Sequence, residues 1–358
     1  MSPRLRLLPP LLLWLATPAL GAGPGFDRIV IDDDFPGAYQ VEVADVNGDG
    51  KPDVVALGGG TCAWYENPSW TKRLISTPRE TPGVISSATV DLDGDGAAEV
   101  ALAFEFAMNS PNKGKLLLAR RGEKLDDPWT FTQVAEIGSI HRLRWGHVDG
   151  DGKPDLVVAP IFGPSATPPN FQEEPAHVLA YSTAGKVDPA GWTRISVTDA
   201  RVLHAIDVLD LDGGGRSEIL TASNLGVTLS VPSRDGHRFT TRLIGQGVAG
   251  KPPKTGSSEV HVGKLRGGRR FLATVDPWHG TEVSIRLEEE NSPLSFGPRQ
   301  VIDTTLKEGH ALWVADVDGD GDDEIFAGYR GPGTSLLAFD HDPEEKSWTR
   351  QLLDDKIA

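Results

Sequence analysis

The chain alternates short apolar segments with polar, glycine-rich loops, and this rhythm recurs along almost its whole length. In the first repeat unit, an alternating segment (39–44) precedes an Asp- and Gly-rich loop, which is followed by a continuous apolar run (54–57). A third apolar segment (62–65) and a more polar one that begins with Trp-Thr (70–75) complete the unit. Period-two alternation predicts half-buried β-strands, and short continuous apolar runs predict fully buried ones. We therefore predict an all-β chain with four strands per unit.

The loop between the first two strands of a unit carries the pattern D-x-[DN]-G-D-G-x-x-[DE]. Copies begin at Asp45, Asp91, His147, Asp210 and Asp316, and a degenerate copy begins at Gly263. Four-stranded units at a period of roughly 50 residues are typical of β-propeller blades. A β-sandwich array or a β-helix fits this rhythm less well.

The number of units predicts the number of blades. Six units favour six blades, and a seventh would need a unit without the acidic motif, hidden in the long interval between the third and fourth copies. An extra strand is expected at Arg28–Ile31, where it would help to close the ring. We expect one propeller domain over residues 22–358.

The first residues have the pattern of a signal peptide. Arg4 and Arg6 precede an apolar stretch, and the small residues around Gly21 suit cleavage after that residue. The alternative, a membrane anchor, needs about 20 uninterrupted apolar residues, whereas Pro9 and Pro10 break this stretch. The sequence predicts a signal peptide over residues 1–21, a secreted or periplasmic protein, and no membrane insertion after cleavage.

Composition narrows the classes of partner. The chain has 35 Lys and Arg against 51 Asp and Glu, a formal net charge of −16. This charge disfavours nucleic acid and anionic lipid as ligands. Because Cys62 is the single cysteine, no intramolecular disulfide can form, and stability must come from packing or from bound metal.

The acidic loops are candidate calcium sites. Positions 1, 3, 5 and 9 of the motif supply side-chain oxygens, and Ca²⁺ prefers six to eight hard oxygen ligands. A solvated acidic turn would explain one copy but not five. The copies at His147 and Asp210 are expected to be weaker, since His147 replaces the first acid and Gly214 the third. The predicted calcium ligands are Asp45, Asn47, Asp49, Asp53, Asp91, Asp93, Asp95, Glu99, Asp149, Asp151, Asp155, Asp210, Asp212, Glu218, Asp316, Asp318, Asp320 and Glu324.

A second set of candidates lies at the other end of the innermost strands. The position six residues before each motif faces the central channel, where equivalent positions of different blades converge. It is occupied by Tyr39, Ile85, His141, His204, Ser257 and His310. The alternative is that these are ordinary channel-lining polar residues. Three histidines at one structural level, however, suggest a shared site.

Residues at the ends of the second strands return to the same face. His279 adds a fourth imidazole, and Glu259 or Asp276 a carboxylate. Neutral imidazoles with a carboxylate suit Zn²⁺ or another transition metal, and a neighbouring histidine could move a proton. Stacking on a sugar would suit Trp278 and Tyr329, beside Arg330.

The repeats resemble the FG-GAP or VCBS family of calcium-binding propellers, to which the integrin α-subunit head belongs. A narrower likeness is to the propeller domain of the aldos-2-ulose dehydratase family. It is carried by the segments Ile140–Trp145, Ala159–Pro164, Gly256–Val260, Asp276–Gly280 and Glu308–Trp313. This resemblance implies dehydration of keto-sugars at a metal on the propeller. The family adds cupin domains to its propeller, and this sequence ends soon after the last predicted blade, so the resemblance does not extend to an isomerisation assigned to cupins.

Two functional hypotheses follow. The first is an exported, calcium-stabilised, metal-dependent sugar dehydratase, a carbon–oxygen lyase. The resemblance implies that its catalytic residues are His141, His204, His279 and His310, and Tyr39, Glu259, Asp276, Trp278, Tyr329 and Arg330 are its predicted ligand-binding residues. The alternative is a noncatalytic propeller that binds glycan or protein. Both predict a carbohydrate or other small-molecule ligand, or a protein partner in the second case.

Overall fold

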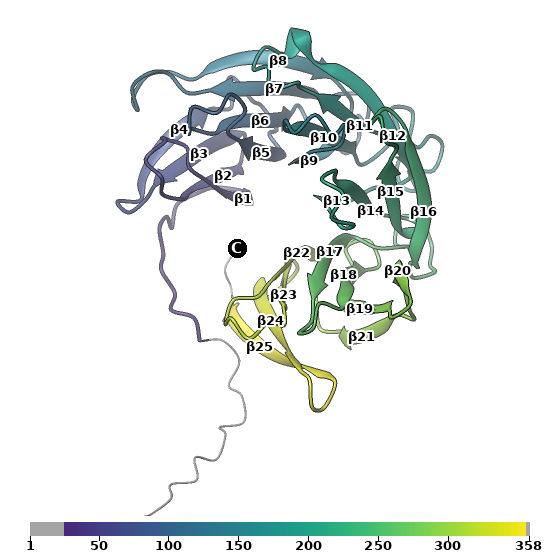
Figure 1. Ribbon diagram of the computed structural model, residues 1–358. Helices are drawn as coiled ribbons and strands as arrows, with labels where there is room; N and C mark the ends of the chain where they lie inside the picture. The colour runs from purple at the N-terminus through teal and green to yellow at the C-terminus, as the bar shows by residue number, and fades with distance from the viewer. Residues whose placement is uncertain (1–24, 356–358) are drawn as a thin grey trace, which may run out of the picture.

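Six antiparallel sheets stand around a common axis in the computed structural model, which describes residues 25–355 (Figure 1). Each sheet is a blade whose strands follow one another in chain order from the axis outward. Blade 1 comprises β1 (Ala38–Ala44), β2 (Asp53–Gly58), β3 (Thr61–Glu66) and β4 (Thr71–Ser76). Blade 2 comprises β5 (Ser86–Val90), β6 (Glu99–Phe104), β7 (Lys115–Arg120) and β8 (Thr130–Glu136). Blade 3 comprises β9 (Ile140–Gly146), β10 (Asp155–Pro160), β11 (Ala176–Ser182) and β12 (Thr193–Ala200).

The second half of the ring repeats this plan. Blade 4 comprises β13 (Ala205–Leu209), β14 (Glu218–Ser223), β15 (Gly226–Pro232) and β16 (Phe239–Gln246). Blade 5 comprises β17 (Glu259–Lys264), β18 (Arg270–Asp276), β19 (Glu282–Glu289), β20 (Ser292–Phe296) and β21 (Gln300–Asp303), the last two both paired with β19. Blade 6 comprises β22 (Gly309–Ala315), β23 (Glu324–Tyr329), β24 (Ser335–Asp342) and β25 (Ser347–Asp355). The predicted all-β propeller with six blades is confirmed.

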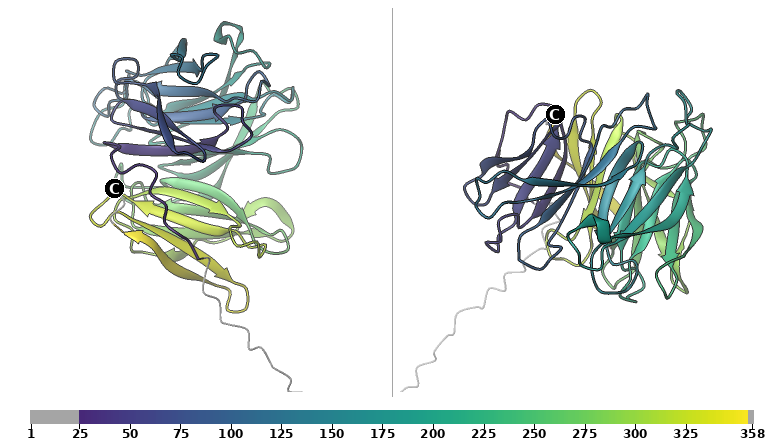
Figure 2. Two further views of the ribbon diagram at one scale, coloured as in Figure 1. Left: turned by 90° about the vertical axis from the view of Figure 1, so that its left-hand side faces the viewer. Right: turned by 90° about the horizontal axis from the view of Figure 1, so that it is seen from above.

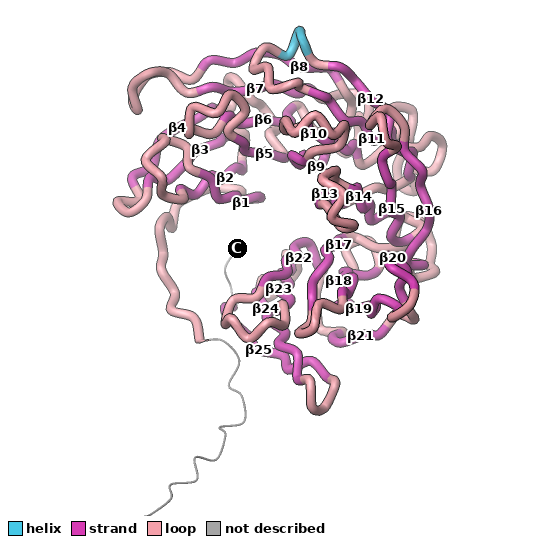
Figure 3. The backbone as a smooth tube through the Cα atoms, in the orientation of Figure 1, coloured by secondary structure: helices cyan, strands magenta, loops and turns pink. Residues whose placement is uncertain are grey.

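Loops gather at both ends of the strands, as the side views show (Figure 2). The one helical segment among residues 25–355 is a 3₁₀ turn, η1 (Pro189–Gly191), at the outer edge before β12 (Figure 3). No helix in this part of the chain has the length and apolarity needed to cross a bilayer. The predicted signal peptide, residues 1–21, lies outside the described residues.

The hydrophobic core is divided into layers between neighbouring blades. Second strands are almost entirely buried, and completely so in β10 and β14, because both of their faces contact other sheets. Outer strands such as β8 are largely exposed and polar. On the inner strands, Leu143, Ile206 and Val260 contribute to the core shared with the preceding blade and are at most 1% exposed.

Blade 1 differs on the face that is directed toward blade 6. Val41, which occupies the position of Leu143 in the repeat, is 71% exposed, and Val43 is 67% exposed. The two blades do meet at the axis, where the Tyr39 hydroxyl lies 3.4 Å from Nε2 of His310. An apolar layer joins each of the remaining pairs of successive blades, but no such layer covers this face of blade 1.

The segment that precedes β1 runs between blade 6 and blade 1 (Figure 1). Phe26 packs edge-on against Phe326, Arg28 pairs with Asp354 at 3.1 Å, and Asp32 accepts a hydrogen bond from Lys72 at 2.8 Å. The prediction of a strand at Arg28–Ile31 is wrong. The segment joins the two blades through side chains instead of a backbone ladder, so no strand forms.

The uneven packing generates a stability prediction. We expect Leu143→Ala to lower the free energy of unfolding by about 2–5 kcal/mol, because it leaves a cavity between blades 2 and 3. We expect the equivalent change Val41→Ala to cost less than about 0.5 kcal/mol, since that side chain is already exposed. Urea unfolding of both variants measures the difference. Equal losses would show that blade 1 is covered as the other blades are.

Candidate functional site

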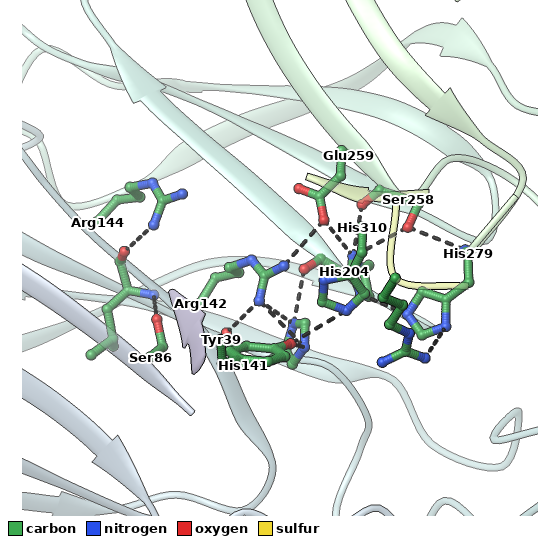
Figure 4. Close-up of polar contacts among 12 residues, drawn as sticks. Tyr39, Ser86, His141, Arg142, Arg144, His204, Ser258, Glu259, His279 and His310 are labelled. Atoms are coloured by element: carbon green, nitrogen blue, oxygen red, sulfur yellow. Dashed lines mark hydrogen bonds and ion pairs between the residues drawn. The ribbon is translucent and has the colours of Figure 1, made fainter. Parts of the chain in front are cut away.

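Four imidazoles meet at the end of the channel where the inner strands begin (Figure 4). His141 lies in β9, His204 directly precedes β13, His310 lies in β22, and His279 belongs to the loop after β18. A ring nitrogen from each of His141, His204 and His310 lies within 4.8 Å of the others. The centroid of the His279 ring is 4.7 Å from that of His204. Residues almost 170 positions apart in sequence thus share one small site.

The blades supply these side chains at one level, with one correction in blade 5. The residue beside His204 is Ser258, whose carbonyl oxygen lies 3.1 Å from His204 Nδ1, whereas the sequence pattern indicated Ser257. The degenerate loop spans only residues 265–269 between β17 and β18, against 147–154 in blade 3. Counting back from the degenerate motif therefore misplaced the level by one residue.

Hydrogen bonds at the Nδ1 atoms define how two of the rings face the site. Nδ1 of His141 lies 3.0 Å from the carbonyl oxygen of His204, and Nδ1 of His204 lies 3.1 Å from the carbonyl oxygen of Ser258, with Oε1 of Glu259 also 2.9 Å away. Because a carbonyl and a carboxylate only accept, Nδ1 of His204 carries the proton, and its Nε2 lone pair faces the site. Nε2 of His141 faces the Tyr39 hydroxyl at 2.9 Å. Metal-binding histidines typically have this arrangement, with the second nitrogen held by an oxygen.

A buried ion pair lies beside the histidine cluster and contacts two of its rings. Nη2 of Arg142 lies 3.1 Å from Oε1 of Glu259, and both side chains are less than 9% exposed. Glu259 thereby bonds both Arg142 and His204, and Arg142 also lies against the His141 ring, with Nη1 3.1 Å from Nδ1. A buried carboxylate and guanidinium are tolerated because each compensates the other's charge.

Burial and neighbouring cations keep the imidazoles neutral. Burial, and then the charge of Arg142, lower the pKa of His141 and His204 well below the usual range of histidine. Burial also lowers the pKa of His310 and brings that of His279 to about 2, with Arg330 and Lys254 adding to the effect on His279. Neutral imidazole is the form that binds a metal ion.

The predicted ligand-binding residues divide into two groups. Tyr39 and Glu259 contact the histidines directly, Trp278 stacks on His279 at 4.3 Å between centroids, and Arg330 Nη2 lies 3.0 Å from Nδ1 of His279. The other two predicted residues are engaged elsewhere.

Asp276 and Tyr329 do not contact the cluster. Asp276 is 1% exposed and accepts a hydrogen bond from Nε of Arg299 at 2.8 Å within blade 5. Tyr329 packs at the core between blades 5 and 6, and its hydroxyl lies 3.0 Å from that of Ser335.

Sequence reasoning missed two contributors. Arg142 follows His141 directly, and strand alternation would have sent its side chain to the opposite face. The ring of Phe106, in the loop after β6, lies 5.8 Å from that of His141. The signal for Arg142 was a charged residue between apolar positions at the start of β9, since buried arginine is rare unless it is paired.

The acidic loops lie at the far end of the same strands. The last acid of each motif is buried and accepts a hydrogen bond from the backbone N–H of the second motif residue, at 2.7 to 3.0 Å. Three of the loops each bring three carboxylate oxygens within 4.8 Å of one another. These sets are Asp91, Asp93 and Glu99; Asp210, Asp212 and Glu218; and Asp316, Asp318 and Asp320.

Two observations indicate that these loops suit a cation. Burial raises the pKa of Asp155 to about 6 and that of Glu324 to about 7. One oxygen of each of these carboxyl groups is buried without a hydrogen-bond partner. In the third loop, His147 Nδ1 lies 2.9 Å from the carbonyl oxygen of Lys153, so this side chain bonds its own loop. The chemistry of the donor set fits Ca²⁺.

The neutral histidines predict acid sensitivity of the metal-free protein. Below about pH 6.5 the unfolded chain protonates His141 and His204, whereas the folded protein does not. Since the unfolded state then binds more protons, the protein has its full free energy of unfolding only above that pH. As the pH decreases from about 6.5, the free energy of unfolding decreases by up to about 1.4 kcal/mol per pH unit for each of these two histidines.

Urea unfolding from about pH 5 to about pH 8 measures this slope. His204→Gln should make the slope shallower, whereas His177→Gln, at an exposed histidine in β11, should leave it unchanged. A slope that is the same in both variants would contradict the prediction.

Comparison with known proteins supports the resemblance. Residues 114–289 match the family described as aldos-2-ulose dehydratase, beta-propeller domain, and residues 45–102 match the FG-GAP-like repeat. Aldos-2-ulose dehydratase of Phanerodontia chrysosporium is 23% identical over 352 residues, covering 86% of this chain. The chain spans only 38% of the length of that relative.

Solved structures share the fold. A lectin of Agrocybe aegerita, described as recognising non-reducing terminal N-acetylglucosamine, has a TM-score of 0.59 at 16% identity, covering 90% of this chain and 81% of its own. A putative 6-phosphogluconolactonase of Bacteroides fragilis has a TM-score of 0.51 at 10% identity, covering 93% and 84%. The chain is thus a six-bladed β-propeller that is similar in sequence to the propeller domain of aldos-2-ulose dehydratase and, over a shorter stretch, to the FG-GAP-like repeat.

Proposed function

We propose that this protein is an exported, metal-dependent sugar dehydratase whose active site is the axial histidine cluster. The observation that carries the proposal is the convergence of His141, His204 and His310, whose ring nitrogens lie within 4.8 Å of one another in a buried, neutral setting. Three nitrogen ligands with an open position are typical of catalytic zinc sites. We infer that Zn²⁺ or a similar ion binds there, and that it supplies Lewis acidity toward a keto oxygen.

The surrounding residues have separate roles in this proposal. The carbonyl oxygen of Ser258 accepts the Nδ1 proton of His204, and with the nearby Glu259 carboxylate it holds that ring with its Nε2 facing the site. Tyr39 offers a hydroxyl between His141 and His310. His279, beside the three ligands, is left to hydrogen-bond or exchange a proton with the sugar. Elimination of water from a keto-sugar removes a proton beside the carbonyl and a hydroxyl from the next carbon.

Carbohydrate is the ligand class that the relatives favour. The curated relative is a dehydratase of aldos-2-uloses by name, and a lectin that recognises N-acetylglucosamine shares the fold. The noncatalytic alternative, a propeller that binds glycan, differs only in the absence of turnover. The same experiment therefore separates the two.

Metal analysis tests the proposed site. After weakly held calcium is removed, we expect about one transition-metal ion per chain, with zinc the leading candidate. His204→Ala and His310→Ala should each weaken Zn²⁺ binding by at least about 100-fold, because each removes one of the three proposed metal ligands. His177→Ala, outside the cluster, is the matched control and should bind Zn²⁺ as the unaltered protein does.

Turnover is measured in the same samples. Incubation with a panel of keto-sugars should produce enone absorbance that His310→Ala abolishes. Bound zinc without an enone from any keto-sugar would favour the glycan-binding alternative. Absence of the metal, with ligand binding unchanged in His141→Ala and His310→Ala, would overturn the site altogether.

We also propose that the acidic loops bind Ca²⁺ and stabilise the propeller. Clustered carboxylates repel one another, and buried acids with raised pKa values gain most from a neighbouring cation. Each occupied site would stabilise the fold by about 2.7 kcal/mol at a calcium concentration 100 times its dissociation constant.

Calcium removal tests this role. We expect the melting temperature to fall on chelation and to rise again with added Ca²⁺ in a concentration-dependent way. Asp318→Asn should reduce this calcium-dependent shift, and Asp33→Asn, an exposed acid outside the loops, should leave it intact. Identical melting with chelator and with calcium would contradict the proposal.

A further inference from the structure

The acidic loop of blade 2 contacts a cation that belongs to the chain itself. Arg120 is the last residue of β7, and its Nη2 lies 2.8 Å from Oδ2 of Asp93, the third residue of the motif. Its Nε lies 3.4 Å from Oε1 of Glu99, the ninth residue. Asp91, Asp93 and Glu99 are the residues whose oxygens this loop brings together, so one guanidinium group bridges two of the three.

The strand register explains why the arginine reaches this point. Val100 pairs with Ala119 in the ladder between β6 and β7, so Glu99 and Arg120 stand opposite each other one step further along. Residues directly opposite each other in an antiparallel pair project from the same face of the sheet. The backbone of β7 therefore places Arg120 beside the ninth motif residue.

The residue at this ladder position differs from blade to blade. Opposite the ninth motif residue, the third strands have Glu66 in blade 1, Ser182 in blade 3, Val231 in blade 4 and Asp340 in blade 6. Of the five blades that carry the acidic motif, only blade 2 has a cation here.

The ninth acid is also partnered differently in blade 2. In each blade with the motif, this acid uses one oxygen to accept a backbone hydrogen bond, as Glu99 does from the N–H of Leu92 at 2.9 Å. The other oxygen of Asp155 and of Glu324 is buried and has no hydrogen-bond partner within residues 25–355. The corresponding oxygen of Glu99 is the one that faces Arg120. Arg120 therefore stands where blades 3 and 6 leave an acceptor open for an added cation.

Blade 5 has the same kind of pair with the charges exchanged. Its second strand begins with Arg270, at the place of Glu99, and Glu288 stands opposite in β19. Nε of Arg270 lies 2.9 Å from Oε2 of Glu288, and Nη2 lies 2.8 Å from Oε1. The loop of this blade lacks the acidic motif. An arginine–glutamate pair thus already stands in blade 5 at the two positions that Glu99 and Arg120 occupy in blade 2.

Cations also lie at the loops of blades 1 and 6, but at a different motif residue. Nζ of Lys51 lies 2.9 Å from Oδ2 of Asp49, and Nη2 of Arg266 lies 2.6 Å from Oδ2 of Asp320. Asp49 and Asp320 are the fifth residues of their motifs, and both cationic side chains are more than half exposed. Among the described residues, neither cation forms an ion pair with the buried ninth acid. These loops keep that acid available to a metal ion.

We propose that Arg120 is the resident cation of the blade 2 loop, so that blade 2, like blade 5, is held by an arginine–glutamate pair and binds no Ca²⁺. The inference rests on the calcium role proposed above and limits that role to blades 1, 3, 4 and 6. A guanidinium group suits this place because its planar fork can donate to two carboxylates at once. Once there, it repels Ca²⁺ and occupies two of the acids that the ion would need.

Counting bound Ca²⁺ by equilibrium dialysis of the full-length protein tests the inference. Arg120→Ser gives blade 2 the residue that blade 3 has, and it should bind about one Ca²⁺ more per chain than the unaltered protein. Arg194→Ser, which removes an exposed arginine from β12, is the control and should leave the number unchanged. Asp93→Asn should also leave it unchanged, whereas Asp318→Asn, at the same motif position in blade 6, should lower it by about one.

Thermal unfolding provides a second readout. Asp93→Asn should lower the melting temperature by about 1–3 °C both in chelator and in Ca²⁺, because an ion pair within the chain needs no metal. Asp318→Asn should lower it only when Ca²⁺ is present. Arg120→Ser should melt below the unaltered protein in chelator and recover when Ca²⁺ is added, since the metal then replaces the lost guanidinium.

The outcomes separate this inference from the calcium role of the other loops. Bound Ca²⁺ in the unaltered protein with no additional ion in Arg120→Ser would overturn the inference alone. A loss of one Ca²⁺ in Asp93→Asn would overturn it as well, and this variant decides the question if Arg120→Ser does not fold. An unaltered protein that binds no Ca²⁺ at all would refute the calcium role, whatever Arg120→Ser binds.

Discussion

The packing of apolar sheet faces between successive blades is the interaction on which the rest of this molecule depends. It places the start of every inner strand at one level around the axis, so residues from four different blades can touch. Without that layer-by-layer burial, His141 and His310 would have no reason to be neighbours. The site therefore depends on the ring of blades, and no single segment of the chain forms it.

The site requires a set of polar groups to be buried at the axis. Arg142, Glu259, His141 and His204 are all less than 9% exposed, where an unpaired charge would be strongly unfavourable. The network resolves this by pairing the Arg142 guanidinium with the Glu259 carboxylate and by giving His141 and His204 hydrogen-bond partners. Such a network is rigid, because moving one member away from its partner would leave the other member buried and unpaired. Rigid, neutral imidazoles are what a metal-dependent active site needs.

The two ends of the inner strands have opposite electrostatic character. Carboxylates crowd the loops at one end, whereas imidazoles and cations such as Arg330 and Lys254 surround the cluster at the other. The strongly negative net charge of the chain therefore says little about the ligand of the axial site. It reflects mainly the acidic loops, which are the proposed Ca²⁺ sites.

The sequence by itself favoured six blades and determined the strand order, the level of the three histidines and the place of the acidic loops, because each follows from a repeat that is local in the chain. Only the tertiary structure decided which residues complete the site. Arg142 and Glu259 are 117 residues apart, and Arg330 and His279 are 51 apart, so no local pattern links them. The register of blade 5 and the uncovered Val41 were likewise settled by packing against other segments, which a repeat pattern does not record.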